Sequence, residues 1–198
     1  MRGDGHARAG RRDADIAKGL AAGLVGGLVA SWTMNMFQGM WSRREVGVEK
    51  PHGAQGIKPY VEGQTEEQAP SALPESRGKQ QDDPTEKIAE AVSERVLDRS
   101  LTEGEKEPAG TVVHYVFGIA SGGLYGALAE VAPVLTVGAG LPFGAVFWLT
   151  ADEIVVPALG LSEKPTEYPP STHAYSFFSH LVYALTIEAV RRTVRRAL

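Results

Sequence analysis

The chain has 198 residues, 43% of them apolar, no cysteine and a formal net charge of -4. The lack of cysteine excludes disulfide frameworks, thiolate metal sites and a cysteine nucleophile. Charge is unevenly distributed: residues 42–111 hold 10 Lys/Arg and 15 Asp/Glu, whereas residues 112–162 hold three acids and no base. A water-exposed helix normally carries several charges on its outer face, so this second region indicates a lipid environment.

The N-terminal segment combines a basic tail with an apolar helix. Residues 1–15 are rich in Gly and Arg and are expected to form a disordered, cytoplasmic tail. Residues 16–41 form the first predicted transmembrane helix, which is too long for the roughly 7–15 apolar residues of a signal peptide. Small or polar residues recur along it every four positions and would let a second helix approach closely; they are Gly19, Gly23, Gly27, Ser31, Asn35 and Gly39.

Residues 42–111 are predicted to be an acidic extracytoplasmic loop that contains one helix. Asp83 as N-cap, Pro84 at the first helical position and Glu86 three residues after the cap predict a helix over residues 84–99. Its apolar residues share one face and predict an amphipathic helix that lies on the bundle or at the membrane surface; they are Ile88, Val92, Val96 and Leu97. Residues 101–110 are expected to be an acidic linker.

Two further transmembrane helices are predicted over residues 112–131 and 138–161, separated by a turn at Pro133. The first carries a second stripe at intervals of four: His114, Gly118, Gly122, Gly126 and Glu130. The other carries Gly140, Gly144, Trp148 and Asp152 on one side, with Glu153 next to Asp152. Each acid near the bilayer centre costs about 2.5–3.5 kcal/mol, so this pair needs compensation from neighbours, water or protonation.

The last predicted transmembrane helix, residues 172–190, leads into a basic tail over residues 191–198. Its membrane-flanking bases are Arg191, Arg192, Arg195 and Arg196, which is typical of a helix that reaches the cytoplasmic face. Polar residues at every fourth position should face other helices: Thr172, Ser176, His180, Ala184 and Glu188. Four crossings place both basic ends in the cytoplasm. The predicted fold is therefore an all-α, membrane-embedded four-helix bundle with Gly-rich helix interfaces.

Three segments carry a resemblance to a known family: GALAEVAP (126–133), VVPALGL (155–161) and SHLVYALTIEAVRR (179–192). There the chain resembles the YagU-like family of bacterial inner-membrane proteins, a domain of unknown function. The resemblance implies a multi-pass inner-membrane location, an association with acid tolerance and no assigned enzyme activity. It points to a set of family-pattern positions: Glu130, Pro133, Gly160, His180, Glu188, Arg191 and Arg192.

The ionisable groups inside the predicted helices suggest one function. Desolvation moves the protonation of carboxylates and histidines into the range of about pH 5–8, and a line of such groups across a membrane is what a proton relay requires. The residues predicted to form a proton or solute path are Glu130, Asp152, Glu153, His180 and Glu188. This pattern predicts a small proton- or solute-conducting transporter, and its link to pH stress is what the resemblance implies.

Each of these residues also has a structural explanation. Glu188 precedes Arg191 and Arg192 by three and four positions, the spacing of an ion pair on a helix surface. Glu130 can extend to headgroup water, and His180 can be a neutral histidine hydrogen-bonded to a neighbouring helix. The alternative function is therefore a non-catalytic structural or interaction protein of the lipid bilayer, in which helix 84–99 docks a protein partner or a second copy of the chain.

Other function classes find little support in the sequence. His173, His180, Asp152 and Glu153 lack the close spacing of metal-binding histidine motifs, so no metal site is predicted. No serine elbow, phosphate-binding loop or dinucleotide fingerprint is present, and neither enzyme activity nor a cofactor is expected. Nucleic-acid binding is not expected either, because the bases flanking the membrane helices are confined to short tails.

Overall fold

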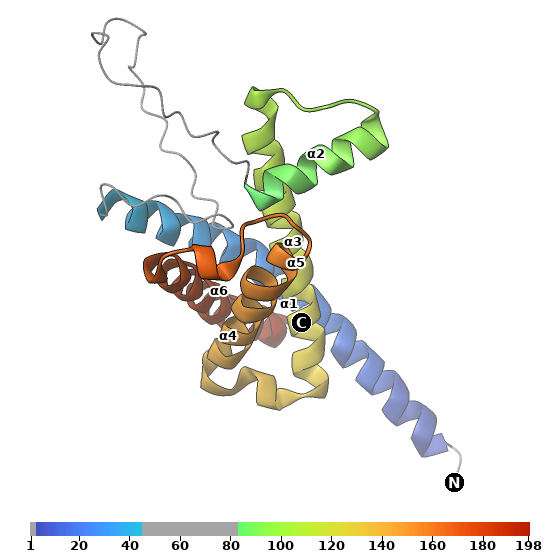
Figure 1. Cartoon of the computed structure of the whole chain (residues 1–198). Helices are drawn as coiled ribbons and strands as arrows, with labels where there is room; N and C mark the ends of the chain where they lie inside the picture. Colours follow the sequence, from blue (N-terminus) through green and yellow to red (C-terminus); the bar gives the residue numbers. More distant parts are fainter. Residues whose placement is uncertain (1–2, 45–82) are drawn as a thin grey trace, which may run out of the picture.

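The computed structural model describes residues 3–44 and 83–198, and the regular structure within these ranges is entirely helical (Figure 1). The long helices are α1 (Gly3–Arg44), α3 (Glu103–Val131) and α6 (Pro170–Ala197). The shorter ones are α2 (Pro84–Leu97), α4 (Leu141–Thr150) and α5 (Val156–Ala158). A π-helical turn, η2 (Ala151–Val155), joins α4 to α5, and the 3-10 segments η1 (Pro133–Gly140) and η3 (Pro165–Glu167) lead into α4 and toward α6.

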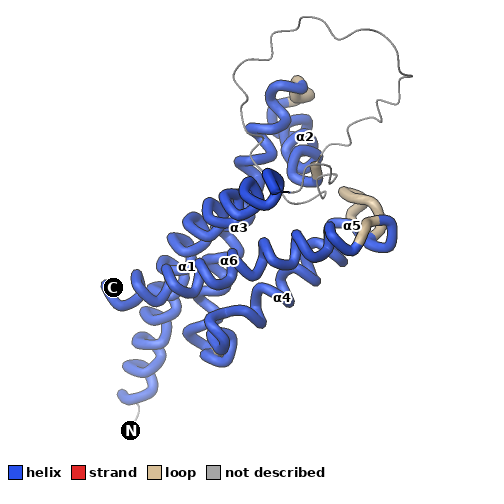
Figure 2. Tube along the Cα trace, turned by 90° about the vertical axis from the view of Figure 1, so that its left-hand side faces the viewer, coloured by secondary structure: helices blue, strands red, loops and turns tan. Residues whose placement is uncertain are grey.

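α1 packs against both α3 and α6, α4 packs against α6, and α2 packs against α3. Figure 2 shows the start of α1 and the C-terminus of the chain at the same end of this bundle, and α2 and α5 at the opposite end. We call these the terminal end and the α2 end. α1 runs from the terminal end toward the α2 end, whereas α3 and α6 run in the reverse direction.

Glycines lie where α1 and α3 approach most closely. A Cβ atom at Gly27 would lie 2.5 Å from the carbonyl oxygen of Gly118, and one at Gly23 would overlap the carbonyl oxygen of Gly122. The converse also holds, since a Cβ at Gly122 would lie 2.5 Å from the carbonyl oxygen of Gly23. Any side chain at these positions would force the two helices apart, so the backbone separation depends on the missing Cβ atoms.

Glycines on α4 and its preceding turn face α6 in a similar way. A Cβ at Gly144 would lie 2.7 Å from the Cβ of Ala184 and 2.8 Å from the carbonyl oxygen of His180. Gly140 has a left-handed φ of 82° and precedes α4. A Cβ there would lie 3.1 Å from the hydroxyl of Tyr125, which ties the turn to the interior of the bundle.

Three segments are long and apolar enough to cross a membrane: Asp15–Trp41, Glu103–Val131 and Pro133–Ala158. α6 is not among them, although residues 172–190 are predicted to cross. Polar residues lower the mean hydropathy of α6, but those of the predicted stripe do not face outward. Thr172, Ser176, His180, Ala184 and Glu188 are all buried, which confirms the prediction that this stripe faces other helices.

Two predicted irregular segments are helical. α1 already begins at Gly3, so residues 3–15 continue the helix, where a disordered tail is predicted. α3 begins at Glu103, within the predicted linker over residues 101–110. The backbone N–H of Thr102 donates to the Glu105 carboxylate at 2.9 Å, and this capping box starts the helix before Pro108.

α2 begins where the sequence pattern predicts a helix start. Thr85 N–H donates to the Asp83 carboxylate at 2.9 Å, and Asp83 N–H donates to the Glu86 carboxylate at 3.1 Å. The helix ends at Leu97, two residues before its predicted end, because Asp98 adopts a left-handed φ of 52°. Residues 45–82, predicted to be loop, lie outside the described residues.

The apolar face of α2 does not pack on the bundle, which is one of its two predicted positions; the other, at the membrane surface, stays a prediction. Ala89 and Ser93 are buried, whereas Val92, Val96 and Leu97 are exposed by 53%, 73% and 61%. The small residues allow the close contact with α3, so the larger apolar side chains point away from it.

The predicted helix over residues 138–161 is divided into several pieces. Gly138, Ala139 and Gly140 have left-handed φ values of 60°, 57° and 82°, so the helix begins only at Leu141. The π-helical turn η2 then interrupts it at the two adjacent acids, and α5 ends at Ala158. Left-handed backbone is incompatible with a continuous right-handed helix, which explains the later start.

Candidate functional site

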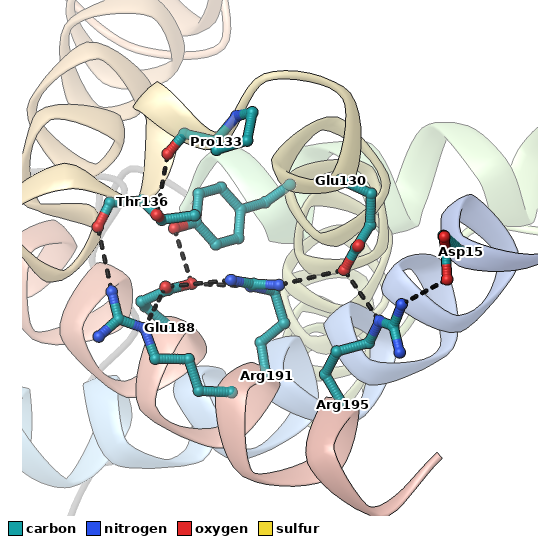
Figure 3. A network of polar contacts seen from close by, with 9 residues as sticks. Asp15, Glu130, Pro133, Thr136, Glu188, Arg191 and Arg195 are labelled. Carbon is teal, nitrogen blue, oxygen red and sulfur yellow. Dashed lines mark hydrogen bonds and ion pairs between the residues drawn. The ribbon is translucent and has the colours of Figure 1, made fainter. Parts of the chain in front are cut away.

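Glu188 lies at the centre of a group of charged residues near the terminal end, which we call the arginine cluster (Figure 3). Its side chain is 1% exposed. It accepts hydrogen bonds from the Tyr125 hydroxyl at 2.9 Å, from Arg191 at 2.8 and 3.1 Å, and from Arg192 at 2.5 Å. A buried carboxylate with this many donors, two of them cationic, is compensated for the loss of hydration.

Glu130 extends the arginine cluster from α6 to α3, and Asp15 extends it to α1. The Glu130 carboxylate lies 3.4 Å from Arg191 and 3.0 Å from Arg195, and Arg195 lies 2.8 Å from Asp15. The hydrogen bond to Glu130 raises the pKa of Arg195 from its ordinary value. The cluster therefore contains three acids and three arginines and joins three helices by charge-assisted hydrogen bonds.

Arg192 connects the arginine cluster to the turn before α4. Its guanidinium donates to the backbone carbonyl of Thr136 in η1 at 3.2 Å, and the Thr136 hydroxyl donates to the carbonyl of Pro133 at 2.9 Å. Figure 3 shows this chain of contacts beside the Glu188 carboxylate. The cluster thus fixes the α3–α4 connection as well as the three long helices.

A second polar group, the histidine cluster, lies near the α2 end and consists of Asp152, Glu153, His173, Ser176 and His180. The Ser176 hydroxyl donates to Asp152, and His180 Nδ1 lies 3.7 Å from the same carboxylate. His180 Nδ1 also lies 3.0 Å from the carbonyl oxygen of Ser176 in its own helix. Since a carbonyl oxygen only accepts, Nδ1 carries the proton in this contact.

His173 lies between Glu153 and a backbone carbonyl. Its Nδ1 lies 2.6 Å from the Glu153 side chain, and its Nε2 lies 3.0 Å from the carbonyl oxygen of Pro165. Since a carbonyl oxygen only accepts, Nε2 carries a proton, and a second proton is shared between Nδ1 and Glu153. The pair is therefore either an imidazolium with a carboxylate or a neutral imidazole with a carboxylic acid.

The π-helical turn explains how two adjacent acids both reach α6. Asp152 and Glu153 lie inside η2 (Ala151–Val155), where the wider turn changes the directions of successive side chains. Asp152 contacts Ser176 on α6, and Glu153 contacts His173 one turn nearer the start of the same helix. Single π-helical turns are frequent at functional sites, and here the turn gives each acid a partner.

Aromatic side chains fill the space between the two clusters, and we call them the aromatic layer: Tyr125, Phe143, Phe147 and Tyr183. Ring centroids lie 4.5 Å apart for Tyr125 and Phe143, 5.5 Å for Phe143 and Phe147, and 5.8 Å for Phe147 and Tyr183. Tyr125 and Tyr183 are buried together with Ile187. Because His180 and Glu188 are eight residues apart, the layer occupies about 12 Å along α6.

The predicted path residues therefore fall into two groups. Glu130 and Glu188 belong to the arginine cluster, whereas Asp152, Glu153 and His180 belong to the histidine cluster. Of the predicted flanking bases, Arg191, Arg192 and Arg195 are in the arginine cluster, and Arg196 is exposed without a role in it. Within the described residues, no group of three or more His, Asp or Glu side chains is arranged to hold a metal ion.

Sequence reasoning missed several participants in these clusters. Tyr125 and Tyr183 lie beside the glycine and serine stripes but belong to the buried core, and Asp15 lies 180 residues from its partner Arg195. The i, i+3 and i, i+4 spacing correctly indicates the contacts of Glu188 with Arg191 and Arg192. No local pattern indicates which residue of another helix each charged or aromatic side chain contacts.

The family of the chain follows from comparison with known proteins. No curated protein and no solved structure matches the chain. A family model described as "Protein of unknown function (DUF1440)" matches residues 65–189, which include all of α3 and both acids of η2. Since the match covers more than half of its length, the chain belongs to the DUF1440 family of proteins of unknown function.

Proposed function

We propose that this chain is a non-catalytic structural or interaction protein of the bacterial inner membrane, with α1, α3, the η1–α5 segment and α6 as its four crossings. The observation that carries the proposal is the separation of its two polar clusters by the aromatic layer. Acids that are paired with arginines and closed off by packed rings stabilise a bundle, and they do not form a continuous path.

The four crossings rest on the environment of α6. Its polar residues are buried against other helices, and such a helix does not need to be apolar on all sides to lie in a bilayer. With four crossings, the start of α1 and the arginines of α6 share one compartment, in agreement with their position at one end of the bundle (Figure 2). The positive-inside rule assigns that compartment to the cytoplasm.

Helix packing at the glycines fits this role. Apolar burial does not drive association inside a bilayer, so helices associate through close backbone contact and hydrogen bonds. Close backbone contact is present where Gly23 and Gly27 meet Gly118 and Gly122. The arginine cluster supplies the hydrogen bonds.

The interaction role rests on α2, whose exposed apolar face consists of Val92, Val96 and Leu97. A single helix face can pair with the same face of a second copy around a two-fold axis, because the contact is then self-complementary. We therefore assign a second copy of the chain as the partner of this face.

A second candidate function is movement of protons or a small solute linked to pH stress. It is favoured by the histidine cluster, in which Asp152 and His180 are buried close together at a π-helical turn. Transport through the described residues would require the aromatic layer to open, since its rings lie between the two clusters.

Flux measurements on the purified chain in sealed liposomes distinguish the two functions. With an imposed pH gradient, we expect proton entry at the rate of empty liposomes, measured with an internal pH-sensitive dye. A flux above that rate that is lost in both His180→Ala and Glu130→Gln would instead establish transport through the two clusters.

A further inference from the structure

Several buried polar atoms near the α2 end have no hydrogen-bond partner among the described residues: Ser31 Oγ, Asn35 Oδ1, His114 Nε2 and Trp148 Nε1. Each such atom costs about 1–3 kcal/mol if it remains unpaired. In native proteins, ordered water hydrogen-bonds buried polar groups that no protein group satisfies. The charged groups at the terminal end differ, because the arginine cluster pairs them with one another.

Three helices meet just on the α2 side of the glycine contacts. A Cβ at Gly118 would overlap the Ser31 hydroxyl and lie 3.6 Å from the ring of Tyr183, so α1, α3 and α6 contact one another at this level. The Tyr183 hydroxyl donates to the carbonyl oxygen of Gly118 at 2.5 Å. This contact forms the boundary between the aromatic layer and the polar residues on its α2 side.

One helical turn nearer the α2 end, all three helices carry polar residues. α1 is antiparallel to α3 and α6, so the step from Ser31 to Asn35 runs in the same direction as the step from Gly118 to His114 and from Tyr183 to Ser179. Asn35 and Ser179 are 3% and 0% exposed. The interior at this level therefore contains amide, imidazole and hydroxyl groups beside the buried side chain of Met34.

The histidine cluster continues this polar interior toward α4 and η2. His180 is adjacent to Ser179 and lies 3.7 Å from Asp152, and its ring packs edge-on against Phe147 at 5.4 Å. Phe147 thus separates the polar side from the terminal end at α4, as Tyr183 does at α6. On both helices, the boundary of the polar region toward the terminal end is an aromatic side chain.

We propose that this half of the bundle contains water that enters from the α2 end, contacts Asn35, His114 and Asp152, and stops at the aromatic layer. Water supplies both the donors and the acceptors that the unpartnered atoms need. It also gives Asp152 and His180 proton exchange with the α2 side alone. The inference is independent of the proposed function, because an aqueous space closed at one end is compatible with a chain that conducts nothing.

The absence of cysteine makes single-cysteine labelling a direct test. The full chain in sealed vesicles of known orientation is exposed to a membrane-impermeant cationic methanethiosulfonate and, separately, to Ag⁺, which passes wherever water passes. Thiols react as thiolates, which form in water and not in lipid, so Asn35→Cys should react at least about tenfold faster than the lipid-facing Met36→Cys. Met36 is next to Asn35 and 50% exposed, so the two report on the same depth.

Two further variants complete the test. Ser31→Cys is close to isosteric and reports on the same space if Asn35→Cys does not fold, and Ile187→Cys reports on the terminal side of the aromatic layer. We expect Ser31→Cys to react with Ag⁺ from the α2 side and Ile187→Cys to remain unmodified. Reaction of Asn35→Cys and Ser31→Cys no faster than Met36→Cys with both reagents would overturn the proposal. Equal reaction of Ile187→Cys would show that the aromatic layer does not close the space.

Discussion

Glu188 is the residue that most strongly couples charge to packing in this protein. Its carboxylate is buried and accepts from Tyr125, Arg191 and Arg192, which come from two helices. Arg191 is itself buried, so removing the acid leaves a guanidinium with only the more distant Glu130 as a counter-charge. The cost of a mutation here is therefore the cost of an uncompensated buried charge.

Glu188→Gln should lower the free energy of unfolding by about 3–5 kcal/mol, because it breaks a buried ion pair from one side. Thermal unfolding of the purified chain in lipid nanodiscs measures the change. Arg196→Gln is the control, since Arg196 is exposed in the same helix. The double variant Glu188→Leu/Arg191→Met should recover part of the loss, since apolar groups replace both charges. Unchanged stability in Glu188→Gln would contradict the assigned role of the cluster.

At the scale of the helix, the contact between α1 and α3 depends on backbone proximity. A Cβ at Gly23 would overlap backbone atoms of Gly122, and backbone cannot rotate away as a side chain can. A Cβ at Gly39, in the same helix, has no heavy atom within 4 Å. These two glycines share a helix and differ in their surroundings.

Gly23→Ala should destabilise the bundle by about 1–3 kcal/mol, the usual cost of overpacking a tight contact. Gly39→Ala should be neutral or stabilising by up to about 1 kcal/mol, because alanine has the higher helix propensity. Chemical unfolding of both variants in the same detergent gives the comparison. Equal effects of the two substitutions would mean that the α1–α3 contact does not depend on the missing side chain.

The exposed face of α2 makes a prediction about assembly. If two copies pair through it, Val92→Ser/Val96→Ser should convert a dimer into a monomer, as measured by native mass spectrometry of the chain released from nanodiscs. Glu94→Gln is the matched control, because Glu94 is exposed on the same helix and is not part of the apolar face. A wild-type chain that is already monomeric would exclude a second copy as the partner.

At the scale of the whole molecule, the four crossings that we propose would fix the side of the membrane on which each segment lies. Single cysteines at Arg12 and Arg196, both exposed, should be labelled by an impermeant reagent from one side of the membrane. A cysteine at Val96, exposed on α2, should be labelled only from the other. Labelling of Arg12→Cys and Arg196→Cys from opposite sides would rule out the proposed topology and the assignment of the cytoplasmic end.

Much of the helical architecture was predictable because side-chain periodicity is a local property. The stripe of Thr172, Ser176, His180, Ala184 and Glu188 indicated the buried side of α6, and the glycine stripes indicated positions where α1 and α3 now touch. The capping pattern at Asp83 located the start of α2. The extension of α1 to Gly3 and of α3 to Glu103 was missed, because polar, Gly-containing composition favours loop only on average.

The sequence by itself determined which segments are helices and which of their sides are polar, small or apolar, since the helical repeat fixes both. Only the tertiary structure decided that Glu130 and Glu188 share Arg191 while Asp152 and His180 meet at the other end, with four aromatic rings between them. Those contacts join residues up to 180 positions apart, as for Asp15 and Arg195. They depend on how the helices cross, which no single helix encodes.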